Sequence, residues 1–153
     1  MGSFEVLVRR DDGSPVVLGN EPLLDDGRPM PTRFWLCDRA LNKAIGRIES
    51  EGAVDHIEAA LPAEVIAKIH ATYEAERDAR VPVGYDGPLP SGGVGGTRIG
   101  VKCLHAHYAN LLVGNDDAIG AWTDERLADV GAAFDPSEPG IMTVWSDGEV
   151  PQP

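Results

Sequence analysis

The sequence has few cysteines, few basic residues and no long apolar run. Cys37 and Cys103 are its two cysteines. A cytosolic location argues against a disulfide between them, and the lack of a CxxC pair argues against a structural zinc site. Lys and Arg number 13 against 25 Asp and Glu, a net charge of −12 that opposes binding to nucleic acid or to an anionic membrane. No apolar stretch approaches the roughly 20 residues of a membrane span, and residues 1–5 lack the features of a signal peptide. We therefore expect a soluble, cytoplasmic protein with no membrane insertion.

Length and composition predict one globular domain over residues 1–153. Hydrophobic residues make up 42% of the chain and charged residues 25%, which is typical of a folded domain. Residues 82–100 are rich in glycine and proline and are predicted to form a loop within this domain. A loop of that length inside a compact domain is more often functional than a mere connection. Residues 146–153 are predicted to be a disordered tail.

The first third of the chain predicts strands followed by a helix. Apolar residues alternate over residues 4–18 around an Asp-Asp-Gly turn, the pattern of a β-hairpin. Aromatic and apolar residues predict a third strand over residues 32–37. Asp38 then stands where a carboxylate would cap the first turn of a helix, and Gly52 stands where that helix would end.

Further helices are predicted along the rest of the chain. Residues 53–60 would add one or two turns, and Pro62 would open a longer helix to about Arg80, with its half at 74–80 solvated. Apolar spacing predicts a helix over residues 101–113.

The C-terminal quarter predicts one more helix and one more strand. Asp116 and Asp117 would cap a turn at 118–122, and Thr123 or Asp124 would cap a short helix to Gly131. Residues 141–145 are predicted to form a strand. The whole pattern indicates an α+β fold, a small antiparallel sheet with an N-terminal hairpin packed on three to four helices.

One segment differs from the rest of the chain in charge. Residues 87–115 contain no Asp or Glu, although 25 of the 153 residues of the chain are acidic. The same segment contains Arg98, Lys102, His105 and His107. Such segregation suits an anionic ligand, although a buried core would also exclude acids.

The glycines of this segment support the first interpretation. Residues 92–100 are rich in glycine and precede the predicted helix, and free amides at a helix start together with closely approaching backbone form a phosphate cradle. The phosphate-binding loop motif fails, because Lys102 is one residue out of step, and the dinucleotide motif also fails. We predict binding of a phosphate or carboxylate by Gly95, Gly96, Arg98 and Lys102.

Cys103, His105 and His107 alternate along the chain and are the candidate catalytic residues. In a strand all three would point to one side and would suit zinc. In the predicted helix Cys103 and His107 would lie about 40° apart on neighbouring turns, as a zinc-binding pair or as a thiolate and its base. His105 would then be a core or pocket histidine, and packing alone is the third alternative. His56 and His70 are predicted to be ordinary surface or boundary histidines.

Several blocks of the sequence resemble a bacterial family catalogued as domain-of-unknown-function family 501. The resemblance runs from about Glu5 to Trp122, and the Lys-Cys-Leu-His sequence at 102–105 is its most specific part. The blocks are residues 9–17, 25–36, 92–98, 100–109 and 116–120. The resemblance implies a cytoplasmic bacterial protein whose gene often lies near those for enolase, a septum-formation protein and an exopolyphosphatase-like enzyme. It implies no activity, cofactor or catalytic residue.

Two functions are therefore predicted as alternatives. The first is binding of an anionic small molecule at the glycine-rich loop, with Cys103, His105 and His107 lining the pocket and a bound divalent metal as one form of it. The second is a non-catalytic partner protein of the cell-division or envelope machinery, which would dock through its acidic helix at 74–80 or through an exposed tryptophan. No motif identifies a reaction or an oligomeric state.

Overall fold

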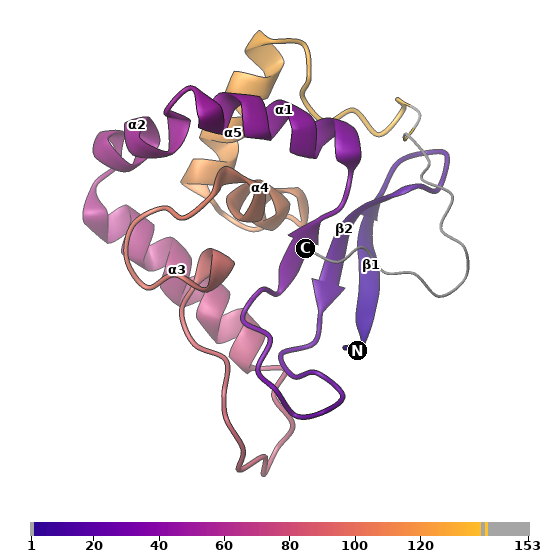
Figure 1. Cartoon of the computed structure of the whole chain (residues 1–153), viewed down its shortest axis with the longest axis vertical. Coiled ribbons are helices and arrows are strands. Elements are labelled where there is room, and N and C mark those ends of the chain that lie inside the picture. The colour runs from indigo at the N-terminus through magenta and orange to yellow at the C-terminus, as the bar shows by residue number, and fades with distance from the viewer. Residues whose placement is uncertain (1, 139, 141–153) are drawn as a thin grey trace.

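A three-stranded antiparallel sheet forms one side of the protein (Figure 1). The computed structural model describes residues 2–138 and 140, so the strand predicted at 141–145 and the tail at 146–153 lie outside the described residues. Strands β1 (Phe4–Arg9) and β2 (Pro15–Asn20) form the predicted hairpin, and β3 (Phe34–Leu36) pairs with β2. The order β1-β2-β3 follows the chain.

The helices pack against one face of the sheet. Val17 pairs with Leu36, and both side chains are buried, whereas their neighbours Leu18 and Trp35 form the next pair and are more exposed. This alternation is expected because successive side chains of a strand point to opposite faces. Trp35 keeps 40% of its surface exposed.

Helix α1 (Arg39–Ser50) begins where the sequence predicts. The carboxylate of Asp38 accepts a hydrogen bond from the Leu41 amide at 3.0 Å, and this bond satisfies one of the free donors of the first turn. Helix α2 (Ala53–Ala60) follows Gly52, and α3 (Ala63–Asp78) follows Pro62. The predicted helices in this part of the chain are confirmed to within two residues at each end.

The C-terminal half of α3 is the exposed surface that its charges predict, except at Arg77. Arg77 is fully buried, and Tyr73 is buried as well and accepts the Arg33 amide hydrogen at 2.6 Å. The prediction for residues 74–80 was wrong at Arg77, because the side chain turns inward under the loop that follows the helix.

Helix α4 (Leu104–Leu112) lies near the centre of the molecule and contacts both β3 and α5 (Figure 1). It begins three residues later than predicted, and Cys103 has an extended backbone with φ −157° and ψ 149°. Two carboxylates explain the difference. Glu58 accepts the Val101 amide hydrogen and Glu49 accepts the Leu104 amide hydrogen, each at 2.6 Å, so 101–103 is held out of the helix.

Helix α5 (Ala118–Asp129) begins earlier than the predicted short helix. Asp117 is its cap and accepts the amide hydrogens of Ile119 and Gly120 at 3.0 and 2.9 Å. Thr123 is therefore inside the helix, where its hydroxyl donates to the Ile119 carbonyl at 2.8 Å. In the part of the chain that the structure describes, five α-helices accompany the sheet, and the α+β fold is confirmed. None of these helices combines the length and apolar character that crossing a bilayer requires.

Candidate functional site

The glycine- and proline-rich loop after α3 is held against that helix by a buried cation. The Arg77 guanidinium donates to the carbonyl oxygens of Pro90 at 3.3 Å and Pro31 at 3.4 Å, and also to that of Gly92. Its charge is balanced by Asp78, 2.8 Å away. The predicted loop at 82–100 is therefore ordered where it passes α3, and it contains one short helical turn, η1 (Val94–Gly96).

His70 of α3 fixes the next part of the loop. Its Nδ1 accepts the Val94 amide hydrogen at 3.1 Å, and its Nε2 lies 2.8 Å from the Gly100 carbonyl oxygen. Because an amide can only donate and a carbonyl can only accept, these two bonds place the ring hydrogen on Nε2. His70 is buried, so the prediction of a surface or boundary histidine was wrong.

Close packing of the loop on α3 requires glycine at position 93. A Cβ atom there would lie 2.4 Å from the Cβ atom and 2.6 Å from the Cα atom of His70. Gly95 has a different role, because its φ of +64° gives the turn its left-handed step while a Cβ atom would meet nothing closer than 3.7 Å.

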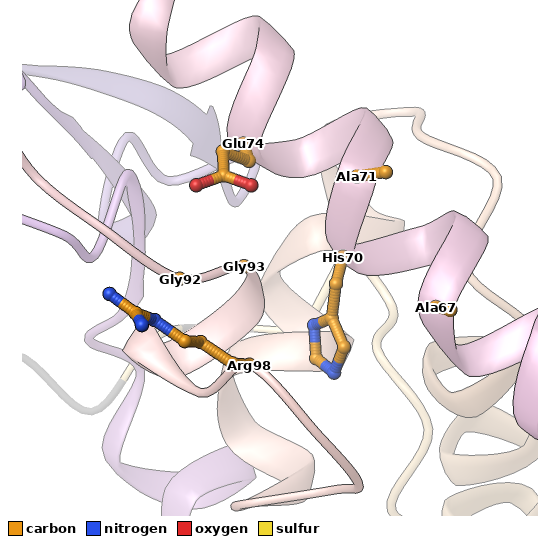
Figure 2. A pocket seen from close by; sticks show the side chains of 7 residues that line it. All are labelled: Ala67, His70, Ala71, Glu74, Gly92, Gly93 and Arg98. Carbon is orange, nitrogen blue, oxygen red and sulfur yellow. The ribbon is translucent and has the colours of Figure 1, made fainter.

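A pocket of about 260 Å³ opens between α3 and this loop. Figure 2 shows Arg98 reaching beneath Gly92, with Glu74 across from it on α3 and His70 at the far side. Within the described residues Arg98 makes no ion pair, whereas the Glu74 carboxylate lies 3.6 Å from the buried Arg77 guanidinium. The pocket is therefore lined by one arginine that forms no ion pair in this part of the chain and by one carboxylate that shares Arg77 with Asp78.

The other predicted anion ligands lie outside this pocket. Lys102 donates its ammonium hydrogen to the Gly95 carbonyl at 3.2 Å, and the Gly96 amide hydrogen is taken by the Gly93 carbonyl at 2.9 Å. The amides of Val101 and Leu104 are taken by carboxylates, as described above. Most of the donors that the sequence predicts for an anion are thus hydrogen-bonded to carbonyl or carboxylate oxygens of the protein itself.

A second group of polar side chains meets at the start of α4. The donor atoms of Glu49, Cys103 and His105 all lie within 4.8 Å of one another. The Glu49 carboxylate is 3.2 Å from His105 Nδ1, and His105 Nε2 is 3.1 Å from the Asn42 carbonyl oxygen. All three side chains are half-buried.

Burial and hydrogen bonding act on the charges of this group in opposite directions. Burial opposes the positive charge on His105, but its bonds with Cys103 and Glu49 outweigh that effect and raise the pKa of His105 to about 10. Burial likewise opposes the charge on Glu49, and its bonds with His105 and the Leu104 amide lower the pKa of this carboxyl. The two shifts together favour an ion pair of imidazolium and carboxylate.

His107 is separate from this group. It is 1% exposed, and its Nδ1 lies 2.9 Å from the Asp117 carboxylate, which also accepts from Asn110 at 2.9 Å. His107 Nε2 is buried and has no hydrogen-bond partner. The ring faces His70 with the two centroids 5.8 Å apart. The extended backbone of Cys103 thus brings His105, rather than the predicted His107, to the thiol.

Sequence reasoning missed Glu49 and Asn42. Both belong to α1, and 55 residues separate Glu49 from its partner Leu104. One signal was present: Asn42 and Glu49 are seven positions apart, two turns of a helix, and so share a face beside the apolar Leu41 and Ile45. Polar residues on such a boundary often meet polar partners from another element.

Comparison with known proteins finds one match. The family model described as "Protein of unknown function (DUF501)" matches residues 6–125. No curated protein and no solved structure matches the chain.

Proposed function

The chain belongs to the DUF501 family of proteins of unknown function, and from its own residues we propose that it binds a small phosphate- or carboxylate-bearing molecule. We call the site the anion pocket and define it by His70, Gly92, Gly93 and Arg98. The single observation that carries the proposal is the unpaired Arg98 guanidinium in a pocket of a protein whose net charge is −12.

The charge distribution supports an anionic ligand at this place. Residues 87–115 contribute no carboxylate, and Glu74 is the one acidic residue among those that line the pocket. Arg77, 3.6 Å from that carboxylate, offsets part of its charge, although Asp78 pairs with the same guanidinium at 2.8 Å. A bidentate guanidinium contact is the geometry by which arginine holds carboxylate and phosphate.

The size and the lining of the pocket also limit the class of ligand. A volume of about 260 Å³ is below the range of drug-sized sites, which favours a small molecule over a nucleotide. Glu74 faces Arg98 across the pocket and can only accept hydrogen bonds while ionised, so a ligand with hydroxyl or amino groups beyond its anionic end fits best. Relative to the sequence prediction, the site keeps Arg98 and replaces Gly95, Gly96 and Lys102 by Gly92, Gly93 and His70.

Thermal unfolding with inorganic phosphate tests this proposal. At ten times its Kd the ligand stabilises the folded state by about 1.4 kcal/mol, so the Tm rises, and above the Kd it goes on rising with the logarithm of the phosphate concentration. The rise should be lost in Arg98→Ala and kept in Arg126→Ala, which removes an exposed arginine paired with Asp129. Ionic strength is matched with sodium chloride, because excluded salts stabilise proteins without binding. An equal rise in both variants, or none in the wild type, contradicts the proposal.

The docking protein stays the alternative prediction. Trp35 keeps 40% of its surface exposed, and most of residues 74–80 are exposed too, so both surfaces that the alternative needs are accessible among the described residues. No response of the Tm to phosphate or to simple phosphate esters would favour this alternative.

A further inference from the structure

We propose that Glu49, Cys103 and His105 form a binding site for a thiophilic divalent cation, zinc above all, with one coordination position left open. We call this the α4 metal site. It is separate from the anion pocket and from the Cys103 and His107 pair that helical spacing predicts. The proposal does not depend on anion binding.

The donor set and its spacing suit zinc. A thiolate, an imidazole nitrogen and a carboxylate oxygen are the three ligand types that zinc takes in proteins, at about 2.0–2.3 Å. Ligands at that distance in a tetrahedron lie about 3.3–3.8 Å apart. The three donor atoms already lie within 4.8 Å of one another, with Glu49 and His105 at 3.2 Å. Small side-chain rotations would therefore bring the three donor atoms to the spacing that a zinc ion requires.

The bonds around His105 prepare its Nδ1 as the ligand atom. A metal-binding histidine usually donates its other ring hydrogen to a carbonyl or carboxylate, which fixes the orientation of the ring. His105 does this through Nε2 and the Asn42 carbonyl at 3.1 Å. The proton on Nδ1, which now faces Glu49, is the one that a cation would replace.

Glu49 is also fixed from outside the cluster. Its carboxylate accepts the Leu104 amide hydrogen at 2.6 Å, so the first turn of α4 holds the carboxylate in place beside the thiol. Cys103 is the residue directly before that turn. One backbone feature, the late start of α4, thus positions two of the three ligands.

Burial and ligand number indicate an exchangeable site. The side chains of His105 and Glu49 are 28% and 23% exposed, so a cation can enter and leave. Structural zinc sites have four protein ligands, whereas three with an open position are typical of sites that bind a water or a substrate. Among the described residues this is the one such cluster of three.

His107 is an alternative metal ligand to His105, but its surroundings suit a metal ion less well. Its Nδ1 bond to Asp117 and its unpaired Nε2 also resemble a metal-binding histidine. Its neighbour His70, however, has both ring nitrogens engaged, by Val94 and by Gly100. No group of three metal-ligating side chains in the described part of the chain includes His107, so His107 serves as the control residue.

Cobalt titration of the reduced, chelator-treated protein tests the site. Cobalt bound through a thiolate gives a sulfur-to-metal charge-transfer absorption, which should appear with one equivalent and disappear when zinc displaces the cobalt. Cys103→Ser should lose this absorption. Its zinc affinity, measured by calorimetry, should fall by more than about 100-fold, because losing even a residue that only hydrogen-bonds to a metal ligand lowers metal affinity by about 10–100-fold. Glu49→Gln and His105→Ala should weaken zinc binding as well.

Matched variants keep the result decisive. Cys37→Ser removes the other thiol and His107→Gln removes the other nearby histidine, and both should keep the absorption and the zinc affinity. Circular dichroism of each variant without metal confirms that it is folded. The α4 metal site is overturned if the wild-type protein shows no such absorption. It is also overturned if the Cys37→Ser variant loses the absorption. A loss in His107→Gln equal to that in His105→Ala also overturns it.

Discussion

The carboxylate of Asp38 accepts a hydrogen bond from Arg10 at 2.8 Å, with both side chains about 95% buried. Its other oxygen caps α1 through the Leu41 amide. Arg10 in turn donates to the carbonyl of Asp135 at 2.7 Å. One buried ion pair therefore joins the end of β1, the start of α1 and the segment after α5.

Replacing Asp38 should destabilise the protein strongly. Asp38→Ala leaves the Arg10 charge buried without its partner and removes the helix cap, and breaking a buried pair in this way costs about 3–5 kcal/mol. Asp38→Asn keeps an acceptor for the Leu41 amide and should retain about 1 kcal/mol of this stability. Urea unfolding followed by circular dichroism measures both. As a control, Asp26→Ala breaks an exposed pair with Arg28 and should change stability by less than about 1 kcal/mol.

Two glycines of the loop should differ in their tolerance of alanine. Gly93→Ala drives a Cβ atom into the backbone of His70, so the loop must leave α3, at the upper end of the roughly 1–3 kcal/mol typical of overpacking. At Gly95 there is room for the Cβ atom, so Gly95→Ala loses only the roughly 1 kcal/mol that a left-handed backbone costs an alanine. Thermal unfolding compares them, and an equal or larger loss in Gly95→Ala would contradict the described contacts.

Replacing Arg77 should loosen the loop before it unfolds the protein. Arg77→Lys keeps the charge, but one ammonium cannot reach the carbonyls of Pro31, Pro90 and Gly92 together, so buried acceptors remain unpaired at a cost of about 1–3 kcal/mol. Hydrogen exchange measured by mass spectrometry should become faster in peptides covering 90–97 than in those covering α1. Uniform acceleration over the whole chain would instead indicate global destabilisation.

The Cys37 thiol should react slowly in the folded protein. Burial and, second, the adjacent Asp38 carboxylate raise the pKa of Cys37 to about 11, so the neutral thiol persists at pH values where an ordinary cysteine is already ionised. Because the thiolate is the reactive form, the iodoacetamide rate in Cys103→Ser should rise with an inflection near pH 11. The same variant in urea should show its inflection about two pH units lower, and identical profiles would refute the expectation.

Local signals predict the strands and the first three helices well. The hairpin rests on alternation and on a turn at Gly13, which has φ +86°, and α1 rests on the Asp38 cap. Each of these features needs information from a few neighbouring residues, so the sequence pattern contains it.

The candidate sites depend on contacts that the local pattern does not contain. The start of α4 is set by Glu49 and Glu58 from other helices, and this shift decides that Cys103 meets His105 instead of His107. The charged residues on either side of Arg77 predict that it is exposed. It is in fact bound by carbonyl oxygens from two separate loops. The acid-free segment contains Arg98, Cys103 and His105, so a pattern visible in the sequence does include residues of both proposed sites.

The loop that Arg77 secures has an apex between Val83 and Leu89, where both of these side chains are exposed to solvent and Tyr85 donates to the Gly27 carbonyl at 3.0 Å. It is the lowest part of the molecule in Figure 1. A peptide cut at this apex would leave the bonds from Arg77 to Pro90 and Gly92 bridging the two halves. The halves would remain together as a nicked complex, which makes the apex a suitable place to insert a tag or to join a permuted chain.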